Sequence, residues 1–281
     1  MSFSQINLHK AALATDMAGR ELEGKKSSIL LVTEPYTNKN KMVGLPTGAK
    51  VIYDRNSKLA VRAGIVATPD LNIASMESWC TRDCAVALIK IGGKQTLLIS
   101  LYLDITLEVQ PEWLIRLLKM AMGRKYPVII GADSNAHSTL FGNDCNKRGE
   151  QLEDLILRFG LRVENKGEAP TFEVRRGDRI VQTSIDVTLT HGLRVDVRDW
   201  HVDRGYNASD HNTIRFKVML DKSEPESIRP WGKADWTAFK TELKTDYAIP
   251  DAMSMKKLDR LVDRMYAALD KAMDKACPKI K

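Results

Sequence analysis

Eight short apolar runs, many of them rich in β-branched residues, dominate the first 220 residues of this 281-residue chain. Runs of this length and composition predict β-strands. We expect the strands at residues 3–7, 28–34, 60–67, 84–91, 95–101, 127–132, 183–190 and 213–218. Amphipathic stretches at 8–22, 109–122 and 149–159 predict helices between them. Strands interrupted by a few helices favour a layered α/β or α+β domain.

The chain changes character near residue 220. Residues 221–230 are charged and contain two prolines, which is typical of a linker. Residues 231–243 predict a short helix, and residues 256–276 predict a long amphipathic one. A lone amphipathic helix cannot bury its apolar stripe, so it packs on the main domain or on a later part of a longer chain. We therefore expect a domain of residues 1–220 and an extension of residues 221–281.

Composition excludes several classes of protein. Hydrophobic residues make up 43% and charged residues 28%, which supports a packed core and argues against disorder. No run of 18 apolar residues predicts a membrane span, and the N-terminus does not resemble a secretory signal peptide. The four cysteines form neither a disulfide framework nor a zinc pattern, so a reducing compartment is expected. The net charge of +7 is compatible with a polyanionic partner without requiring one.

Polar residues with catalytic potential stand at or near the ends of the predicted strands. They are Asn7, Glu34, Tyr102, Asp133 with Asn135, Asp186 and Asp210 with His211. Most of them also have an ordinary structural interpretation, as a loop carboxylate, a turn or a cap. Asp186 is the exception, because it lies within an apolar strand and a buried carboxylate is costly unless it is paired or bound to a metal. If the strands align, we expect these side chains to converge on one edge of the sheets.

This set of side chains suits one kind of chemistry. Carboxylates and amides are ligands for a hard cation such as Mg²⁺, with Mn²⁺ as a substitute. A histidine beside an aspartate suits acid/base catalysis or the stabilisation of a phosphorane. Together they predict metal-assisted attack of water on a phosphodiester.

Ten short motifs then occur in an order that resembles a known group of enzymes, the exonuclease–endonuclease–phosphatase superfamily of DNase I and the apurinic/apyrimidinic (AP) endonucleases. More narrowly, the chain resembles the endonuclease domain of non-LTR (LINE-type) retrotransposons. The motifs cover about residues 3–218 and are Gln5-Ile6-Asn7-Leu8, Thr33-Glu34-Pro35-Tyr36, Ser100-Leu101-Tyr102, the segment 131–137, Asn146-Lys147-Arg148-Gly149, Gly160-Leu161 with Asn165, Pro170-Thr171-Phe172, Ser184-Ile185-Asp186-Val187, Trp200 and Ser209-Asp210-His211. The tail around residues 231–236 and 277–278 resembles the segment that leads to a reverse transcriptase, so the chain resembles part of a polyprotein.

The resemblance implies a four-layer, DNase I-like sandwich of two sheets with helices on the outer faces. It also implies a Mg²⁺-dependent endonuclease that nicks double-stranded DNA and leaves a 3′-hydroxyl primer for target-primed reverse transcription. The expected partners are DNA and the reverse transcriptase domain of the same polyprotein, with action in the nucleus and no membrane partner.

The resemblance also implies a role for each matching residue. Glu34, Asn7 and Asp210 correspond to metal-binding positions. Asp133 corresponds to the aspartate that positions the attacking water, Asn135 to the amide that contacts phosphate, and Tyr102 to the tyrosine that supports the phosphate or leaving group. His211 corresponds to the histidine that stabilises the pentacovalent phosphate, with Asp210 as its acid/base neighbour and Asp186 behind it. The sequence departs from many AP endonucleases at His9, where they carry an acidic residue, and at Ala132, which moves Gly131 one place early.

Two exposed segments are candidates for DNA contacts. Residues 173–181 predict a hairpin with Arg175, Arg176 and Arg179 around a Gly-Asp turn, and in the retrotransposon family such a hairpin enters the minor groove. Lys39 and Lys41 follow Glu34 and are expected to contact the phosphate backbone. Residues 200–207 predict a second loop, whose aromatic residues either contact a distorted base or pack at the sheet edge.

Two alternative functions follow from the same residues. One is an AP endonuclease or another phosphodiesterase of the superfamily, against which His9 and the tail argue. The other is a non-catalytic DNA-binding module on the same fold, because a fold alone does not determine a function. The complete set of polar residues at the strand ends argues against the second alternative.

Overall fold

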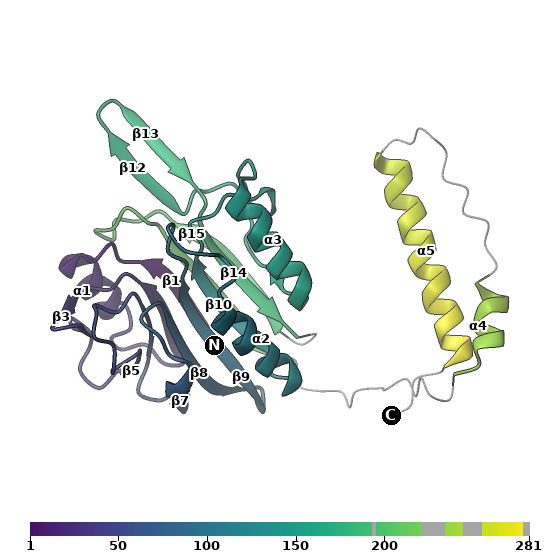
Figure 1. The fold of residues 1–281 in the computed structure, drawn as a ribbon, viewed down its shortest axis with the longest axis horizontal. Coiled ribbons are helices and arrows are strands. Elements are labelled where there is room, and N and C mark those ends of the chain that lie inside the picture. Colours follow the sequence, from purple (N-terminus) through teal and green to yellow (C-terminus); the bar gives the residue numbers. More distant parts are fainter. Residues whose placement is uncertain (193–194, 221–233, 244–254, 278–281) are drawn as a thin grey trace. The chain divides into compact units, whose positions relative to one another are not determined.

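The computed structural model describes residues 1–192, 195–220, 234–243 and 255–277 (Figure 1). The chain divides into two compact units, Met1–Lys222 and Ser223–Lys281. Within the described residues, no helix combines the length and the apolar character that a membrane span requires.

The larger unit is built on two six-stranded sheets. The first has the order β15–β16–β1–β2–β6–β5, in which β1 and β2 are parallel and the other neighbours are antiparallel. Its strands are β1 (Ser2–Asn7), β2 (Ser28–Thr33), β5 (Lys50–Ile52), β6 (Ala63–Ala67), β15 (Val195–Asp203) and β16 (Thr213–Leu220).

The second sheet has the order β11–β14–β10–β9–β8–β7, with β9 and β10 parallel. Its strands are β7 (Ile73–Ser75), β8 (Cys84–Ile91), β9 (Lys94–Tyr102), β10 (Val128–Asp133), β11 (Arg162–Val163) and β14 (Asp186–His191). Two hairpins stand apart from both sheets. They are β3 (Thr37–Asn38) with β4 (Lys41–Met42), and β12 (Phe172–Arg176) with β13 (Arg179–Thr183).

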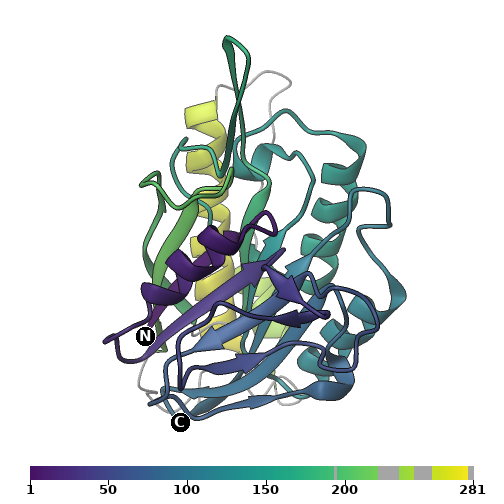
Figure 2. The same ribbon diagram turned by 90° about the vertical axis from the view of Figure 1, so that its left-hand side faces the viewer.

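Helices cover the outer sides of the sheets (Figure 2), and three clusters of buried apolar side chains hold these elements together. Between the sheets, Phe3 and Ile65 of the first sheet share one buried cluster with Leu98 and Ile129 of the second. On the outer face of the first sheet lies α1 (Ala12–Arg20), and on that of the second lie α2 (Glu112–Gly123) and α3 (Lys147–Phe159). The expected four-layer sandwich, with helices on the outer faces, is therefore confirmed.

Two differences from the predicted elements have clear local causes. The helix expected at 8–22 begins only at Ala12, because His9 and Lys10 both have positive φ angles, which a helix cannot accommodate. The loop expected at 200–207 is half strand, since β15 continues to Asp203 after a register shift between Arg198 and His201. The irregularity hides the strand from pattern analysis, because it interrupts the alternation of inward and outward side chains.

The smaller unit is a pair of helices, α4 (Trp236–Glu242) and α5 (Met255–Ala276). Asp235 caps α4, because its carboxylate accepts hydrogen bonds from the N–H groups of Thr237 and Ala238. Glu242 forms ion pairs of 2.7 Å with both Lys271 and Lys275 of α5. The expected linker at 221–230 and Trp231 lie outside the described residues, and the idea that this tail leads to a reverse transcriptase stays a prediction.

Candidate active site

Tyr102, Asp133 and Asp186 lie side by side at one edge of the second sheet. Tyr102 ends β9, Asp133 ends β10 and Asp186 begins β14. In the strand register, Asp133 pairs with Tyr102 on one side and with Asp186 on the other. Parallel neighbours end at the same edge of a sheet, and an antiparallel neighbour begins there, so the order of the strands alone brings these three residues together.

Asn7 connects this row to the first sheet. It ends β1 beside the parallel end of β2, which Glu34 follows directly. The Asn7 amide nitrogen donates to Asp133 Oδ2 at 2.7 Å and, more weakly, to Glu34 Oε2 at 3.4 Å. Asn7 is 2% exposed, so this hydrogen bond fixes the spacing of the two sheets where the predicted site residues meet. We refer to the edge that carries Asn7, Glu34, Tyr102, Asp133 and Asp186 as the active-site edge.

His211 lies just before β16, the last strand, and faces Asp186. Its Nδ1 lies 2.8 Å from Asp186 Oδ2, and both side chains are almost completely buried. The ring of Phe172 packs edge-on against the imidazole, with the ring centroids 5.0 Å apart. Thr171 Oγ1 accepts the backbone N–H of Asp186 at 3.0 Å, which holds the carboxylate in place. The imidazole is thus oriented by a buried carboxylate, as in hydrolytic triads.

Burial and nearby charges shift the pKa values of Asp133 and His211. Burial and the nearby charge of Asp186 together raise the pKa of Asp133 to about 7, although His211 and the hydrogen bond from Asn7 oppose this shift. Burial lowers the pKa of His211, but the charge and hydrogen bond of Asp186 outweigh it and raise this pKa to about 9. The site therefore combines a carboxylate that can take up a proton near neutral pH with an imidazole that holds one.

Asn135 is held in an unusual backbone conformation beside Asp133. Its φ angle is +46°, and its N–H donates to Asp133 Oδ1 at 3.2 Å. Its side-chain amide donates to the carbonyl oxygen of Leu103 at 3.1 Å, which leaves one amide hydrogen for another acceptor.

Arg148 explains part of the Asn146-Lys147-Arg148-Gly149 motif. Its guanidinium donates to five backbone carbonyl oxygens, those of Leu103, Ile105, Leu107, Ser134 and Asn135. Two loops that flank Tyr102 and Asp133 are thereby tied to the start of α3. The motif is visible in the sequence, but the contacts of its arginine arise only in the folded domain.

The three residues expected to bind metal occupy the same end of the molecule as this row. Asp210 Oδ1 is buried and accepts no hydrogen bond, although His9 Nδ1 lies 3.2 Å away, and Glu34 Oε1 lies 2.9 Å from Lys10 Nζ. A buried carboxylate oxygen without a hydrogen bond is consistent with a cation ligand, and the donor atoms of Glu34, Asn7 and Asp210 are oxygens, as Mg²⁺ prefers.

A second, tighter cluster of potential ligand atoms is also present. Among the described residues, Asp133, Asp186 and His211 each offer one potential ligand atom, and these three atoms lie within 4.8 Å of one another. Asp186 and His211 are hydrogen-bonded to each other, so we interpret Asp186 as the residue that orients the His211 imidazole and not as a metal ligand.

The predicted DNA-contact residues lie on two exposed hairpins. Arg175, Arg176 and Arg179 surround the tip of the β12–β13 hairpin, which projects beyond the sheets (Figure 1). The base of this hairpin is bound to the site, because Glu173 N–H donates to the carbonyl oxygen of Asp210 at 2.8 Å. Lys39 and Lys41 are exposed on the β3–β4 hairpin.

Trp200 does not contact solvent as a DNA-binding residue would. It is 7% exposed, and its indole N–H donates to Thr188 Oγ1 at 3.0 Å. Of the two interpretations that the sequence left open for this loop, packing is correct for Trp200, whereas Tyr206 is 81% exposed.

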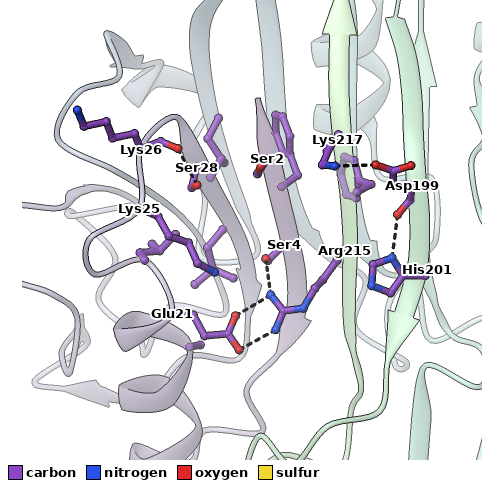
Figure 3. Close-up of a pocket in the computed structure, with 16 residues that line it drawn as sticks. Ser2, Ser4, Glu21, Lys25, Lys26, Ser28, Asp199, His201, Arg215 and Lys217 are labelled. Carbon is purple, nitrogen blue, oxygen red and sulfur yellow. Dashed lines mark hydrogen bonds and ion pairs between the residues drawn. The ribbon is translucent and has the colours of Figure 1, made fainter.

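A separate hollow of about 560 Å³ lies on the outer face of the first sheet (Figure 3). Four of its charged side chains are paired, with Arg215 bound to Glu21 and Lys217 to Asp199 (Figure 3). None of the predicted site residues lines it, so its size does not make it a candidate active site.

Comparison with known proteins shows which families this chain is similar to. Residues 96–215 match the family described as endonuclease-reverse transcriptase. The chain is 27% identical over 295 residues to the putative 115 kDa protein in type-1 retrotransposable element R1DM of Drosophila melanogaster, covering 98% of this chain and 28% of that protein. It is 26% identical over 257 residues to the retrovirus-related Pol polyprotein from type-1 retrotransposable element R1 of Bradysia coprophila, covering 81% of this chain and 25% of that protein.

Solved structures show the same relationship. The endonuclease domain of TRAS1, a telomere-specific non-LTR retrotransposon, is 30% identical with a TM-score of 0.69, over 79% of this chain and 99% of that domain. The AP endonuclease LMAP from Leishmania major shares the fold with a TM-score of 0.59, at 13% identity over 78% of this chain and 87% of that enzyme.

The family match and the TRAS1 domain place the chain among the hydrolytic enzymes of the exonuclease–endonuclease–phosphatase superfamily. Within that superfamily, the chain belongs to the endonuclease domains of non-LTR retrotransposons. It spans about a quarter of the length of the two curated relatives.

Proposed function

We propose that this domain nicks double-stranded DNA in a Mg²⁺-dependent reaction, and that the 3′-hydroxyl it leaves primes reverse transcription. The observation that carries the proposal is the single edge at which Tyr102, Asp133 and Asp186 align and at which Asn7 joins the two sheets. The same proposal implies a partner and a location for this domain. A reverse transcriptase domain of the same polyprotein would use the nick, and the nucleus would be the site of action.

The protein's own residues can carry out the proton transfers. Asp133, whose pKa is raised to about 7 by burial and by Asp186, can accept a proton from the attacking water. The Asn7 amide holds this carboxylate at 2.7 Å and so fixes the direction of attack. Burial and the charges of Glu34 and Asp133 raise the pKa of Tyr102 to about 12, so its hydroxyl remains a hydrogen-bond donor at neutral pH.

The developing negative charge has two further partners. Asp186 holds His211 through Nδ1, which leaves Nε2 of a protonated imidazole to stabilise the phosphate. Asn135 retains one amide hydrogen for a phosphate oxygen. Glu34, Asn7 and Asp210 would hold the Mg²⁺, which when bound supplies a positive charge that neutralises phosphate oxygens.

The hairpins would position the DNA. The three arginines of the β12–β13 hairpin are exposed beside Ile180, which is 62% exposed, and this combination of cationic and apolar side chains suits a minor groove. Lys39 and Lys41 would contact the phosphate backbone, which positions the DNA without reading its sequence.

Conversion of supercoiled plasmid to open circle tests the proposal. We expect nicking by the wild type with Mg²⁺, with weaker or equal activity in Mn²⁺, and none in EDTA or with Asp210→Ala or His211→Ala. A duplex with a single abasic site, run beside an intact duplex, separates this function from AP repair. Preference for the abasic duplex would contradict the proposal, and DNA binding without any cleavage would favour a binding module.

A further inference from the structure

Arg62 forms a buried clamp between the two sheets near the active-site edge. It stands just before β6 of the first sheet, and its side chain is 9% exposed. Its Nε and Nη2 donate to the two carboxylate oxygens of Asp83 at 2.5 and 2.7 Å, and its Nη1 donates to Asp104. Both carboxylates flank strands of the second sheet, since Asp83 directly precedes β8 and Asp104 closely follows β9. Bidentate pairs of this kind fix the plane of the guanidinium.

The fixed guanidinium lies over the ring of Tyr102. The distance from Arg62 Cζ to the ring centroid is 4.6 Å, which is within the range of a cation–π contact. The backbone N–H of Tyr102 donates to the carbonyl oxygen of Asp83 at 2.9 Å, so Asp83 holds both members of the contact. Within the described part of the chain, no hydrogen bond restrains the Tyr102 hydroxyl, and packing of the ring therefore decides where it points.

The backbone of Arg62 holds the opposite side of the site. Its carbonyl oxygen accepts the N–H of Glu34 at 2.9 Å, and its own N–H donates to the carbonyl oxygen of Arg82 at 2.6 Å. Glu34 has a φ angle of +43°, so this hydrogen bond supports a residue in an uncommon conformation. One residue thus contacts Glu34 through its main chain and Tyr102 through its side chain.

We propose that Arg62 is a positioning residue for the hydrolytic reaction, which sets the Tyr102 ring relative to Glu34 by clamping the ends of the two sheets. The inference rests on the proposed function, in which the Tyr102 hydroxyl acts on the phosphate or leaving group. Lysine cannot replace the arginine here, because an ammonium lacks the planar, five-donor fork that pairs with two carboxylates and stacks on a ring. A small displacement of a reacting group has a large effect on rate, of about 10²-fold for about 1 Å.

The test is a double-mutant cycle of Arg62→Lys and Tyr102→Phe in the plasmid-nicking assay. Tyr102→Phe keeps the ring and removes the hydroxyl, so it separates placement of the hydroxyl from packing. We expect Arg62→Lys to lower kcat about tenfold or more, with KM for DNA and the Mg²⁺ concentration for half-maximal rate both within about twofold of wild type. In the Tyr102→Phe background, the same substitution should have almost no further effect.

Arg215→Lys is the matched control. Arg215 lies in the first sheet and is also bound by two carboxylates. Its Nη2 lies 2.8 Å from Glu21 (Figure 3) and its Nε 2.7 Å from Asp203, but it contacts none of the predicted site residues. We expect Arg215→Lys to lower the Tm about as much as Arg62→Lys while leaving kcat within about twofold of wild type. An equal loss of kcat in both variants, or the full loss from Arg62→Lys in the Tyr102→Phe background, would overturn the proposal.

A spectroscopic readout separates this inference from the proposed function. In protein labelled with 3-fluorotyrosine, the ¹⁹F signal that disappears in Tyr102→Phe belongs to Tyr102. We expect Arg62→Lys to shift that signal and Arg215→Lys to leave it in place. If the wild type does not nick DNA with any metal, the proposed function fails. The inference about Arg62 is then judged by the ¹⁹F signal of Tyr102 alone: it stands if Arg62→Lys shifts the signal and is rejected if the signal does not move.

Discussion

Asp133 and Asp186 stand directly opposite each other on the antiparallel strands β10 and β14, with both side chains buried. Burial is the first cause of the raised pKa of Asp133, and the charge of Asp186 is the second. Asp186 also lies 2.8 Å from His211, and its charge and hydrogen bond raise the pKa of that imidazole to about 9. In the proposed function, these two carboxylates on adjacent strands would serve different purposes, one as the proton acceptor and one as the partner of the imidazole.

Asp186→Asn should separate these purposes. The amide keeps the size of the side chain but removes the charge that raises the pKa of His211, so this pKa should fall from about 9 toward the usual value for histidine. We expect kcat for nicking to fall by about 10²-fold or more at pH 7.5. Measurement of kcat against pH is the check, together with titration of the His211 ring signal by NMR. A variant with unchanged activity and an unchanged histidine pKa would show that Asp186 is only a packing residue.

Asp133→Asn should make the domain more stable while it abolishes nicking. The pKa of Asp133 in the fold, about 7, lies above its unfolded value, so the charged carboxylate destabilises the fold. This penalty is fully present above about pH 7 and disappears as the pH falls toward about 4, the unfolded pKa. We therefore expect the Tm of Asp133→Asn to exceed that of wild type at pH 8, by the equivalent of about 1 kcal/mol or more.

The pH dependence provides the control for this prediction. At pH 4.5 the wild-type carboxyl is neutral in the fold, so the Tm difference between Asp133→Asn and wild type should be small. A difference that is constant from pH 4.5 to pH 8 would mean that the amide stabilises the fold by packing rather than by removing a charge.

The residues at the strand ends could be predicted from the sequence because strand order brings them together. Asp133 and Tyr102 each close an apolar run, and any parallel pairing of those runs places them at one edge. Arg62 could not be found in this way. It lies within the apolar run 60–67, and its carboxylate partners are 21 and 42 residues further along the chain. Nothing local indicates a pairing that exists only once two sheets are stacked.

Other elements were missed for different physical reasons. The strand β15 was overlooked because Asp199 has a φ angle of +54° and breaks its alternation. The five carbonyl oxygens bound by Arg148 belong to loops, whose conformation depends on tertiary contacts rather than on local residue preference. The residues proposed to act on the phosphate could therefore be predicted from local sequence patterns. The residues that hold them in place could not.

Removal of the hairpin arginines should weaken DNA binding without affecting the fold. Arg175, Arg176 and Arg179 are exposed, and replacing all three by alanine removes cationic contacts with phosphates. We expect weaker binding. The slope of log K against the logarithm of the salt concentration should also decrease in magnitude by about 2 to 3. The control replaces Arg116 and Lys119 of α2 together with Arg124, which directly follows α2; all three are also exposed. Equal losses for the two triple variants would mean that net charge alone, and not the hairpin, governs binding.

Gly149→Ala should disrupt the support of the active-site edge from a distance. Gly149 lies in the first turn of α3, next to Arg148, and a Cβ atom there would stand 1.7 Å from the carbonyl oxygen of His137. That separation is far shorter than any permitted contact, so the start of the helix must move and carry Arg148 with it. We expect a loss of about 3 kcal/mol or more in the free energy of unfolding, accompanied by lower nicking activity even at temperatures where the variant is folded.

Gly123→Ala at the end of α2 is the control, because nothing lies within 4 Å of its Cβ position and alanine favours a helix. Denaturant unfolding of both variants measures the difference, and a Gly149→Ala protein as stable as Gly123→Ala would show that this backbone contact does not constrain α3.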